Sequence, residues 1–421
     1  MGKERKRRVL ILTVTAGNGH NACARAMAEE LERAGTEVKI IDYLKVWASR
    51  RTVWTVDKGY GLAVAHALPL YNLSYRRLKR RPPEERFQRK FAQKIALEGA
   101  EGLLREVYAF CPDVIYCTHF YPATALTDLR LLVPIPAKCY VTLLDYSFNP
   151  FWECCIGVDH LNLPTSDLTE KALRLGYRRG QLLFGGIPVA AKFSAAADRC
   201  AARRELGLDG NAFTVMVMFG SVRVHSVGFT DRVELYMAAS DAIVTKLGGT
   251  GATECINRGL PIIAAAKLLP RQEADNAVYL REKGAALLYR NERELREQLT
   301  ALLTDESLRG RMLTAQRAMA GGGVRELAAH IMAQPFAGYG EEPDFLHLRE
   351  RIAAAMKRAL REETAKARSL KNAGGALNSF NRLYGKLMRS APPQTRRSRA
   401  HAVFLRCGAD GRHLSCIPDT S

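Results

Sequence analysis

Short, continuous apolar runs alternate with longer amphipathic stretches in the first half of the chain. The runs lie at residues 9–15, 38–41, 112–119, 138–144, 161–164 and 182–185. Alanines recur at helical spacing over residues 21–34, and Gly35 follows them. Continuous apolar runs are typical of strands buried on both faces, and strands that alternate with helices form parallel sheets. The pattern therefore predicts a first α/β domain over residues 1–190.

The same alternation begins again after about residue 193. Strands are predicted at residues 213–219, 242–245, 261–264 and 285–289, and helices at 252–258, 295–303, 308–319 and 324–332. Gly185-Gly-Ile-Pro-Val189 separates the two series and is typical of a hinge. These elements predict a second α/β domain over residues 191–335.

The stretch 241–276 carries the strongest candidate for a binding site. Gly248, Gly249 and Thr250 stand between a predicted strand and a predicted helix, and Glu254 lies one turn into that helix. Glycines let the backbone approach a bound group, and the N-terminus of a helix favours an anion such as a phosphate. Polar side chains follow the next strand, where open α/β sheets bind ligands: Gln272, Glu273 and Asn276. An ordinary βαβ turn would also use glycine, but the ordered polar set favours a ligand site.

A second glycine turn follows the first strand. It reads Gly17-Asn18-Gly19-His20 and lacks the remaining glycine of the dinucleotide fingerprint, so NAD binding is disfavoured. His20 lies where a neutral imidazole could meet a substrate hydroxyl. Taken alone, however, a histidine at this position is better explained as a helix cap or a solvent-facing side chain.

The composition points to an anionic partner. The chain has 421 residues, which suggests two or three domains, and its net charge is +20 with a pI near 9.7. Such a charge suits a membrane surface, a nucleic acid or a phosphorylated substrate. The ten cysteines are scattered without a C-x-x-C pair, which favours reduced thiols in a cytosolic protein and disfavours zinc. No apolar run is long enough to span a membrane, and residues 9–16 are too short for an export signal.

Residues 47–100 combine aromatic and apolar side chains with a basic run. The run consists of Arg76, Arg77, Lys79, Arg80 and Arg81. Such a segment could lie on an anionic bilayer, with aromatic rings at the interface and cations near the headgroups. A helical insertion with a solvated basic face explains the pattern equally well.

Motifs in both halves together resemble one family of glycosyltransferases. In the first half they are Thr15-Ala-Gly-Asn-Gly-His20, Cys117-Thr-His119, Thr142-Leu-Leu-Asp145 with Trp152, and Gly185-Gly-Ile-Pro-Val189. In the second half they are Gly220-Ser221, Gly228-Phe-Thr-Asp231, Gly248 to Glu254, Gly259-Leu-Pro261, and Gln272-Glu273 with Asn276. Residues 9 to about 332 are similar to the GT-B family that holds monogalactosyldiacylglycerol synthase, the processive diacylglycerol glucosyltransferase and, more distantly, MurG. The long insertion after the second strand favours the diacylglycerol enzymes over MurG.

The resemblance implies two Rossmann-like domains that face a cleft. It implies inverting transfer of a hexose from a UDP-sugar to diacylglycerol or a glycosyldiacylglycerol, with His20 as general base, Asp145 as its helper, and Gly17, Asn18 and Gly19 as the acceptor loop. The implied donor residues are Gly248, Gly249 and Thr250 for the diphosphate, Glu254 for the ribose, Phe229 near the uracil, and Gln272, Glu273 and Asn276 for the sugar hydroxyls. Gly220 and Ser221 are implied to bind the donor as well.

The resemblance implies neither a metal nor another cofactor. The chain has no D-x-D metal signature, and a helix N-terminus can stabilise the leaving UDP instead. The implied partners are the UDP-sugar, the lipid acceptor and an anionic membrane surface, without nucleic acid. The implied location is cytoplasmic, peripheral on the inner face of the cell membrane.

The chain departs from the family pattern at three places. Asn18 replaces the middle glycine of the first turn, although asparagine tolerates left-handed backbone. Only six residues separate Ser221 from Gly228, where the family has a helix, a strand and a helix. Since two parallel strands cannot be joined so briefly, the second domain is predicted to lack that segment near 221–228. Residues 336–421 form a basic tail, predicted to be helical over 346–370 and disordered over 391–421.

Three functions are open at this point. The first is a lipid glycosyltransferase of the diacylglycerol type. The second is MurG-like transfer to a polyprenyl-linked acceptor, which the long insertion disfavours. The third is a non-catalytic, degenerate protein that binds a membrane or a nucleotide sugar, and the missing segment argues for it.

Overall fold

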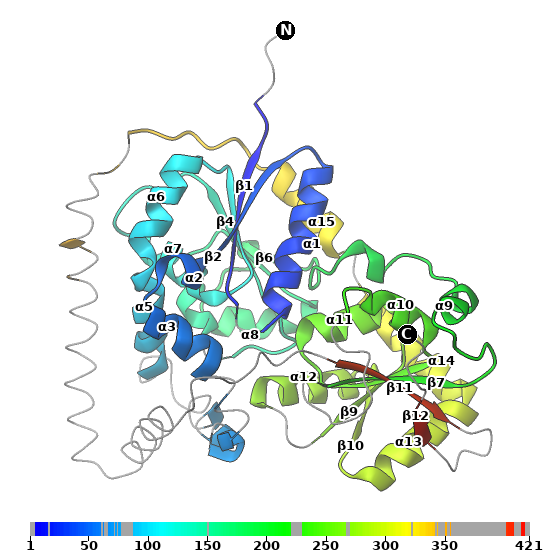
Figure 1. The fold of residues 1–421 in the computed structure, drawn as a ribbon. Helices are drawn as coiled ribbons and strands as arrows, with labels where there is room; N and C mark the ends of the chain where they lie inside the picture. The colour runs from blue at the N-terminus through cyan, green and yellow to red at the C-terminus, as the bar shows by residue number, and fades with distance from the viewer. Residues whose placement is uncertain are drawn as a thin grey trace, which may run out of the picture.

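The structure is a computed structural model of the whole chain (Figure 1). It describes residues 5–59 except 16, 62, 66–70, 72–73, 75–76, 87–219 except 150, 230–266, 270–341 except 321 and 322, 343, 350–351, 354, 401–407 and 414–416.

The N-terminal domain is built on a parallel sheet with the strand order β2-β1-β3-β4-β5-β6. Its strands are β1 (Arg8–Thr13), β2 (Glu37–Asp42), β3 (Val114–Cys117), β4 (Lys138–Thr142), β5 (His160–Asn162) and β6 (Leu182–Leu183). Each lies in or at the edge of a predicted apolar run, and β1, β3 and β4 are almost entirely buried. The predicted parallel α/β architecture of this half is therefore confirmed.

Helices cover both faces of this sheet (Figure 1). They are α1 (Gly19–Arg33), α2 (Tyr43–Trp47), α3 (Arg50–Trp54), η1 (Thr55–Gly59), α5 (Phe87–Glu98), α6 (Ala100–Phe110), α7 (Phe120–Leu129) and α8 (Thr169–Arg174), with single turns η3 (Trp152–Cys155), η4 (Ser166–Leu168), η5 (Arg179–Gln181) and η6 (Ala191–Phe193). Among the described residues, no helix has the length and apolar character needed to cross a bilayer.

The second domain contains a sheet with the order β10-β9-β8-β7-β11-β12. Its strands are β7 (Thr214–Phe219), β8 (Ala242–Thr245), β9 (Ile262–Ala265), β10 (Ala286–Tyr289), β11 (His401–Cys407) and β12 (Leu414–Cys416). Its helices are α9 (Arg199–Glu205), α10 (Val233–Ala239), α11 (Gly249–Arg258), α12 (Arg271–Glu282), α13 (Glu292–Thr304) and α14 (Glu306–Met319). Strands β7 to β10 are parallel, as their apolar runs predict.

The tail differs from its prediction. Disorder was predicted over 391–421, yet β11 pairs antiparallel with β7 over six residue pairs, and β12 pairs with β11. A sheet edge presents unpaired N–H and C=O groups that can align a further strand, wherever that strand lies in the sequence. The prediction of disorder is thus wrong for residues 401–407 and 414–416. The missing segment near 221–228 stays a prediction, and residues 355–400 lie outside the described part.

The chain returns to the N-terminal domain after α14. Helix α15 (Gly323–Met332) packs beside α1, as Figure 1 shows, and the Arg7 guanidinium donates a hydrogen bond to the carbonyl of Gln334. The Tyr339 hydroxyl donates to the carbonyl of Pro112 at 2.8 Å. Helical spacing predicts α15 itself, but it cannot tell which of two neighbouring sheets receives the apolar face of the helix.

One apolar cluster crosses from domain to domain. It contains Leu144 and Tyr146, which follow β4, together with Leu247 and Ala252 around the turn between β8 and α11. Burying a leucine fully contributes roughly 1.5–3 kcal/mol, and Leu247 is completely buried. The two halves are therefore held in contact at the carboxyl ends of their sheets.

Candidate functional site

The two predicted glycine turns meet where the domains face each other. Helix α1 begins at Gly19 and α11 begins at Gly249, and the Thr250 hydroxyl donates to the Gly19 carbonyl at 3.4 Å. A Cβ at Gly19 would lie 2.9 Å from the Thr250 Oγ1, and a Cβ at Gly249 would lie 1.8 Å from the Leu144 carbonyl oxygen. Both positions need glycine because the opposite domain approaches so closely.

Asn18 fits the first turn without strain. Its backbone has φ −85° and ψ −19°, the ordinary right-handed region. The left-handed backbone of this turn falls on Gly17, with φ +94°. The substitution of asparagine for the family's glycine therefore needs no special geometry here.

His20 has one ring nitrogen fixed and the other available. Its Nδ1 lies 2.5 Å from the Thr118 carbonyl, which can only accept, so Nδ1 carries the hydrogen and Nε2 keeps its lone pair. Burial lowers the pKa of His20 to about 4, against the opposing effect of the Thr118 carbonyl. The imidazole is therefore neutral near pH 7, which is the form that can take a proton.

A second histidine, His119, stands beside His20. The ring centroids are 4.6 Å apart, and the His119 Nδ1 accepts a hydrogen bond from the Tyr121 amide at 3.1 Å, capping α7. Burial, and after it the neighbouring His20, keep the pKa of His119 well below its usual value. Sequence reasoning noted His119 within a motif but gave it no role; its position at the carboxyl end of β3 was the available signal.

Asp145 lies at the boundary between the domains. Burial raises its pKa to about 7; the hydrogen bond from Asn276 opposes the rise, and the carboxylates of Glu273 and Asp275 add to it. The Nδ2 of Asn276 donates to Asp145 Oδ1 at 2.8 Å. Within the described residues no hydrogen bond joins Asp145 to His20, so its role as helper of the base stays a prediction.

The predicted donor residues of α11 and α12 lie near this boundary. Burial raises the pKa of Glu254 to about 7, with Lys192 lowering it and Glu234 raising it. Gln272 lies half-buried in the first turn of α12, and Glu273 forms an ion pair with Lys246 at 3.1 Å. Asn276 is completely buried. The three other predicted donor residues, Gly220, Ser221 and Phe229, lie outside the described residues.

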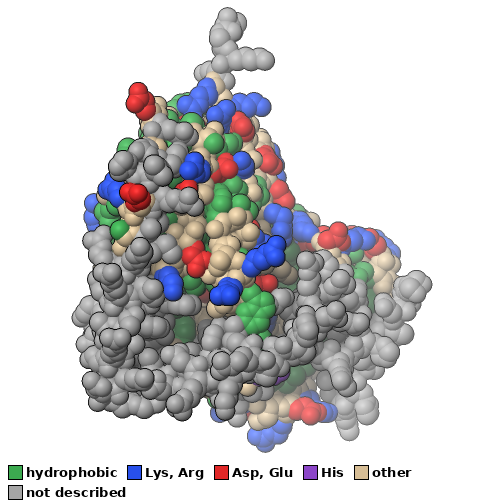
Figure 2. Space-filling model, turned by 60° about the vertical axis from the view of Figure 1, so that its left-hand side comes forward, with side chains coloured by type: hydrophobic (Ala, Val, Ile, Leu, Met, Phe, Trp, Pro, Cys, Tyr) green, Lys and Arg blue, Asp and Glu red, His purple; other side chains and the backbone are tan. Residues whose placement is uncertain are grey.

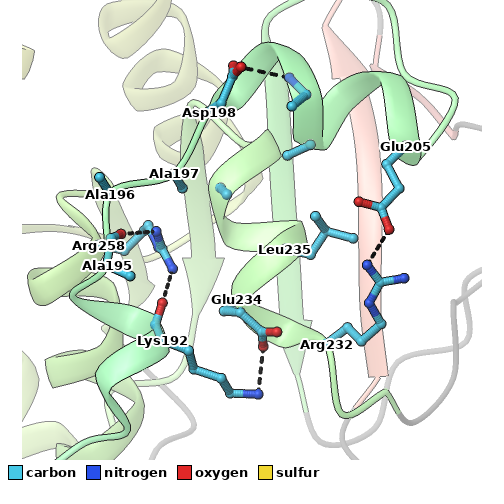
Figure 3. A pocket seen from close by; sticks show the side chains of 13 residues that line it. Lys192, Ala195, Ala196, Ala197, Asp198, Glu205, Arg232, Glu234, Leu235 and Arg258 are labelled. Atoms are coloured by element: carbon cyan, nitrogen blue, oxygen red, sulfur yellow. Dashed lines mark hydrogen bonds and ion pairs between the residues drawn. The ribbon is translucent and has the colours of Figure 1, made fainter.

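A pocket of about 300 Å³ opens between η6, α9, α10 and α11 (Figure 3). Lys192 Nζ forms an ion pair with Glu234 at 2.8 Å, and Arg258 donates to the carbonyl of Ala195 at 2.9 Å. Arg232 pairs with Glu205 on the opposite wall. The charges of Lys192 and Glu234, which line this pocket, also act on the pKa of Glu254, the predicted ribose contact.

Comparisons with known proteins find a different family model in each half of the chain. The model of the monogalactosyldiacylglycerol (MGDG) synthase family matches residues 20–189, and the glycosyltransferase family 28 C-terminal domain matches residues 206–331. Each of the two α/β domains therefore matches a glycosyltransferase family. Over most of its length the chain is similar to the MGDG synthases and the processive diacylglycerol glucosyltransferases.

Individual relatives are distant. A probable chloroplastic MGDG synthase of Glycine max is 26% identical over 353 residues, which span 69% of this chain and 64% of that protein. A processive diacylglycerol beta-glucosyltransferase of Bacillus subtilis is 22% identical over 73% of this chain and 89% of its own length. Among solved structures, Acinetobacter baumannii MurG aligns with a TM-score of 0.48 and 12% identity over 78% of this chain and 99% of its own.

Proposed function

We propose that this protein transfers a hexose, with inversion, from a UDP-sugar to a diacylglycerol-type lipid. The relatives' names support the acceptor class, since they are MGDG synthases and diacylglycerol glucosyltransferases. The observation that supports the chemistry is the neutral His20, whose Nε2 keeps its lone pair. His20 lies on α1 of the first domain, and α1 contacts α11 of the second domain. A base and an anion-stabilising helix end on opposite domains are the two parts that inverting transfer needs.

In the proposed reaction His20 Nε2 removes the proton from the acceptor hydroxyl as its oxygen attacks the sugar. The bond from the sugar to UDP breaks on the other face, and the charge that develops on the diphosphate is stabilised by the N–H groups at Gly249 and Thr250. Glu254 holds the ribose, and Gln272 and Glu273 contact the sugar. No metal is needed for these steps, because the helix N-terminus supplies the stabilisation.

The direct test uses purified protein, UDP-glucose or UDP-galactose, and vesicles that contain diacylglycerol. Glycolipid formation together with UDP release is expected, weakly at most from the chain as it stands and fully once the segment predicted to be missing near 221–228 is inserted. Addition of a polyprenyl-diphosphate sugar should not compete with diacylglycerol; competition would favour MurG-like transfer. UDP binding without transfer or donor hydrolysis would instead identify a non-catalytic nucleotide-sugar binding protein.

Replacing Glu254 with alanine should weaken UDP binding by about 1–3 kcal/mol, because a carboxylate that accepts ribose hydrogen bonds is lost. Titration calorimetry with UDP measures the change. Glu297→Ala on α13 is a matched control, since that carboxylate is exposed. Equal UDP affinity for the Glu254 variant and the wild type would rule out the ribose role.

The protein is further proposed to act as a peripheral protein at the inner face of the cell membrane. Arg76 is exposed, and the rest of the predicted basic run, residues 77–81, lies outside the described residues. On the face shown in Figure 2, the described Lys and Arg side chains are interspersed with Asp and Glu, so the described part of this face offers no purely cationic surface. The basic run is therefore the better candidate for headgroup contact.

Replacing Arg76, Arg77, Lys79, Arg80 and Arg81 with glutamine should release the protein from anionic vesicles. Each cation near the surface contributes roughly 1 kcal/mol, so the loss in partitioning should exceed a hundredfold. Cosedimentation with anionic and with neutral vesicles measures it. A control removes as many exposed cations from α13, α14 and the turn before α13: Arg290, Arg293, Arg296, Arg311 and Arg317. Equal binding by both variants would show that net charge alone decides the association.

A further inference from the structure

Two histidines from neighbouring strands lie side by side at the carboxyl edge of the first sheet. Strands β1 and β3 are parallel neighbours, and the pairing of Leu12 with Cys117 aligns their ends. The chain continues from β1 into α1, which carries His20, and from β3 into His119, the N-cap of α7. The two ring centroids are 4.6 Å apart, with the ring planes inclined at 59°. The sheet register therefore brings both imidazoles to one place beside the predicted acceptor loop.

Backbone groups fix opposite tautomers in the two rings. The Thr118 carbonyl accepts from His20 Nδ1, so Nε2 of His20 keeps a lone pair. The Tyr121 N–H donates to His119 Nδ1, so a neutral His119 carries its hydrogen on Nε2. Burial keeps the pKa of both imidazoles below its usual value, so both rings are neutral near pH 7. One ring thus offers a hydrogen-bond acceptor and its neighbour offers a donor.

The two Nε2 atoms lie on the far side of each ring from the backbone group that fixes it. Within the described part of the chain, neither Nε2 makes a hydrogen bond to the other ring or elsewhere. Since a hydrogen bond spans about 2.9 Å, one oxygen atom can lie within reach of both rings. A hydroxyl matches the pair, because it donates one hydrogen and accepts through two lone pairs.

Aromatic rings surround the donor on His119. The ring centroids of Phe120 and Tyr121 lie 4.1 Å and 4.8 Å from that of His119, and Phe151 stacks on Phe120 at 5.1 Å. Phe120, Tyr121 and His119 are all buried. A polar atom in such surroundings is unfavourable without a partner, and water competes little for it. The pair therefore suits a hydroxyl at the polar end of a largely apolar molecule.

We propose that His119 Nε2 donates a hydrogen bond to the hydroxyl oxygen of the diacylglycerol acceptor while His20 Nε2 takes the hydroxyl proton. The proposal rests on the proposed function for the acceptor class and for His20 as the base. In the transfer step one lone pair of the hydroxyl oxygen forms the bond to the sugar, and the bond from the sugar to UDP breaks with its electron pair on UDP. The proton moves to His20, whereas His119 keeps its hydrogen and holds the other lone pair.

Two substitutions at His119 separate this role from helix capping. The amide of asparagine is attached at the position of Nδ1, so His119→Asn keeps a cap for the Tyr121 N–H and loses the donor at Nε2. The amide of glutamine lies one bond farther out, so His119→Gln keeps an N–H near the position of Nε2. The probes are a short-chain diacylglycerol and the analogue in which hydrogen replaces its hydroxyl.

Displacement of a fluorescent diacylglycerol from the full chain measures both affinities. His119→Asn should bind the diacylglycerol about tenfold less tightly and the analogue as tightly as the wild type does, because only one hydrogen bond is lost. His119→Gln should retain both affinities, and UDP affinity should not change in either variant. Unchanged diacylglycerol binding by His119→Asn, or an equal loss for both lipids, would overturn the proposal. If the wild type binds neither lipid, the acceptor class of the proposed function is wrong and the proposal falls with it.

The tautomers can be measured without any lipid. Nitrogen chemical shifts of isotope-labelled histidine should place the hydrogen on Nδ1 in His20 and on Nε2 in His119 near pH 7. The signals are identified by their loss in His20→Ala and His119→Asn. The same tautomer in both rings would overturn the proposal even if the wild type binds diacylglycerol, in which case the proposed function stands without it.

Discussion

Replacing His20 with alanine is expected to reduce glycosyl transfer about a hundred- to ten-thousandfold while leaving UDP affinity unchanged. The expectation follows from the fixed tautomer, since the Thr118 carbonyl holds the hydrogen on Nδ1 and leaves Nε2 as the base. Glycolipid formation and UDP calorimetry are measured on the same preparations. His330→Ala provides a histidine control, because its ring contacts Tyr140 and His160 instead. Full activity of His20→Ala would show that another group removes the proton.

The pH dependence of transfer gives an independent check on the same residue. A base must be unprotonated, and burial holds the pKa of His20 at about 4, so the base is available at all higher pH values. The rate should fall as the pH drops through about 4, and His20→Ala should lose that limb of the profile. If the transfer rate instead falls as the pH drops through about 6.5, and His20→Ala loses that fall, the imidazole of His20 is exposed to solvent.

Ending the chain at residue 345 is expected to destabilise the second domain selectively. The truncation removes β11 and leaves the edge of β7 unpaired over six residue pairs. At about 0.5–1.5 kcal/mol for each net hydrogen bond, the loss is on the order of several kcal/mol. Thermal unfolding should then show an early transition, with weaker UDP binding, while α1 to α8 stay folded.

A peptide of residues 396–421 added in trans provides the control for truncation. It should abolish the early transition and restore UDP binding, because an exposed sheet edge accepts a strand from a separate chain. A shuffled peptide with the same composition should not. Equal melting of the full and the shortened chain would show that β11 contributes nothing to the sheet.

The gap near 221–228 leads to a related expectation. We expect weak or absent transfer by the chain as it stands, and recovery when the family's helix–strand–helix segment is inserted after Ser221. Because the inserted strand and β11 would compete for the same edge of β7, repair should also release the tail to proteases. His20→Ala in the repaired chain should again abolish transfer. Rapid turnover by the unrepaired chain would show that the gap does not impair the donor domain.

Many elements and most candidate residues could be predicted from local patterns. The buried runs that became β1, β3, β7 and β8 are continuous in sequence, and burial on both faces demands continuous apolar residues. The glycine turns before α1 and α11 could also be predicted from the sequence. At Gly249 only glycine tolerates the close approach of the Leu144 carbonyl. His20, Glu254 and Asn276 follow from their places relative to those turns.

The sequence by itself therefore determined two α/β domains, their glycine turns and the residue types that follow those turns, because each depends on neighbours in the chain. Only the tertiary structure decided which residues far apart in the sequence come into contact. It placed α15 on the first domain, β11 on the edge of β7, His119 beside His20, and Asn276 between Asp145 and Tyr146. Such contacts join residues 99 to 190 positions apart and more, as with His20 and His119 or Tyr140 and His330. Local periodicity records only which face of an element is apolar, so the partner of that face is settled when the whole chain packs.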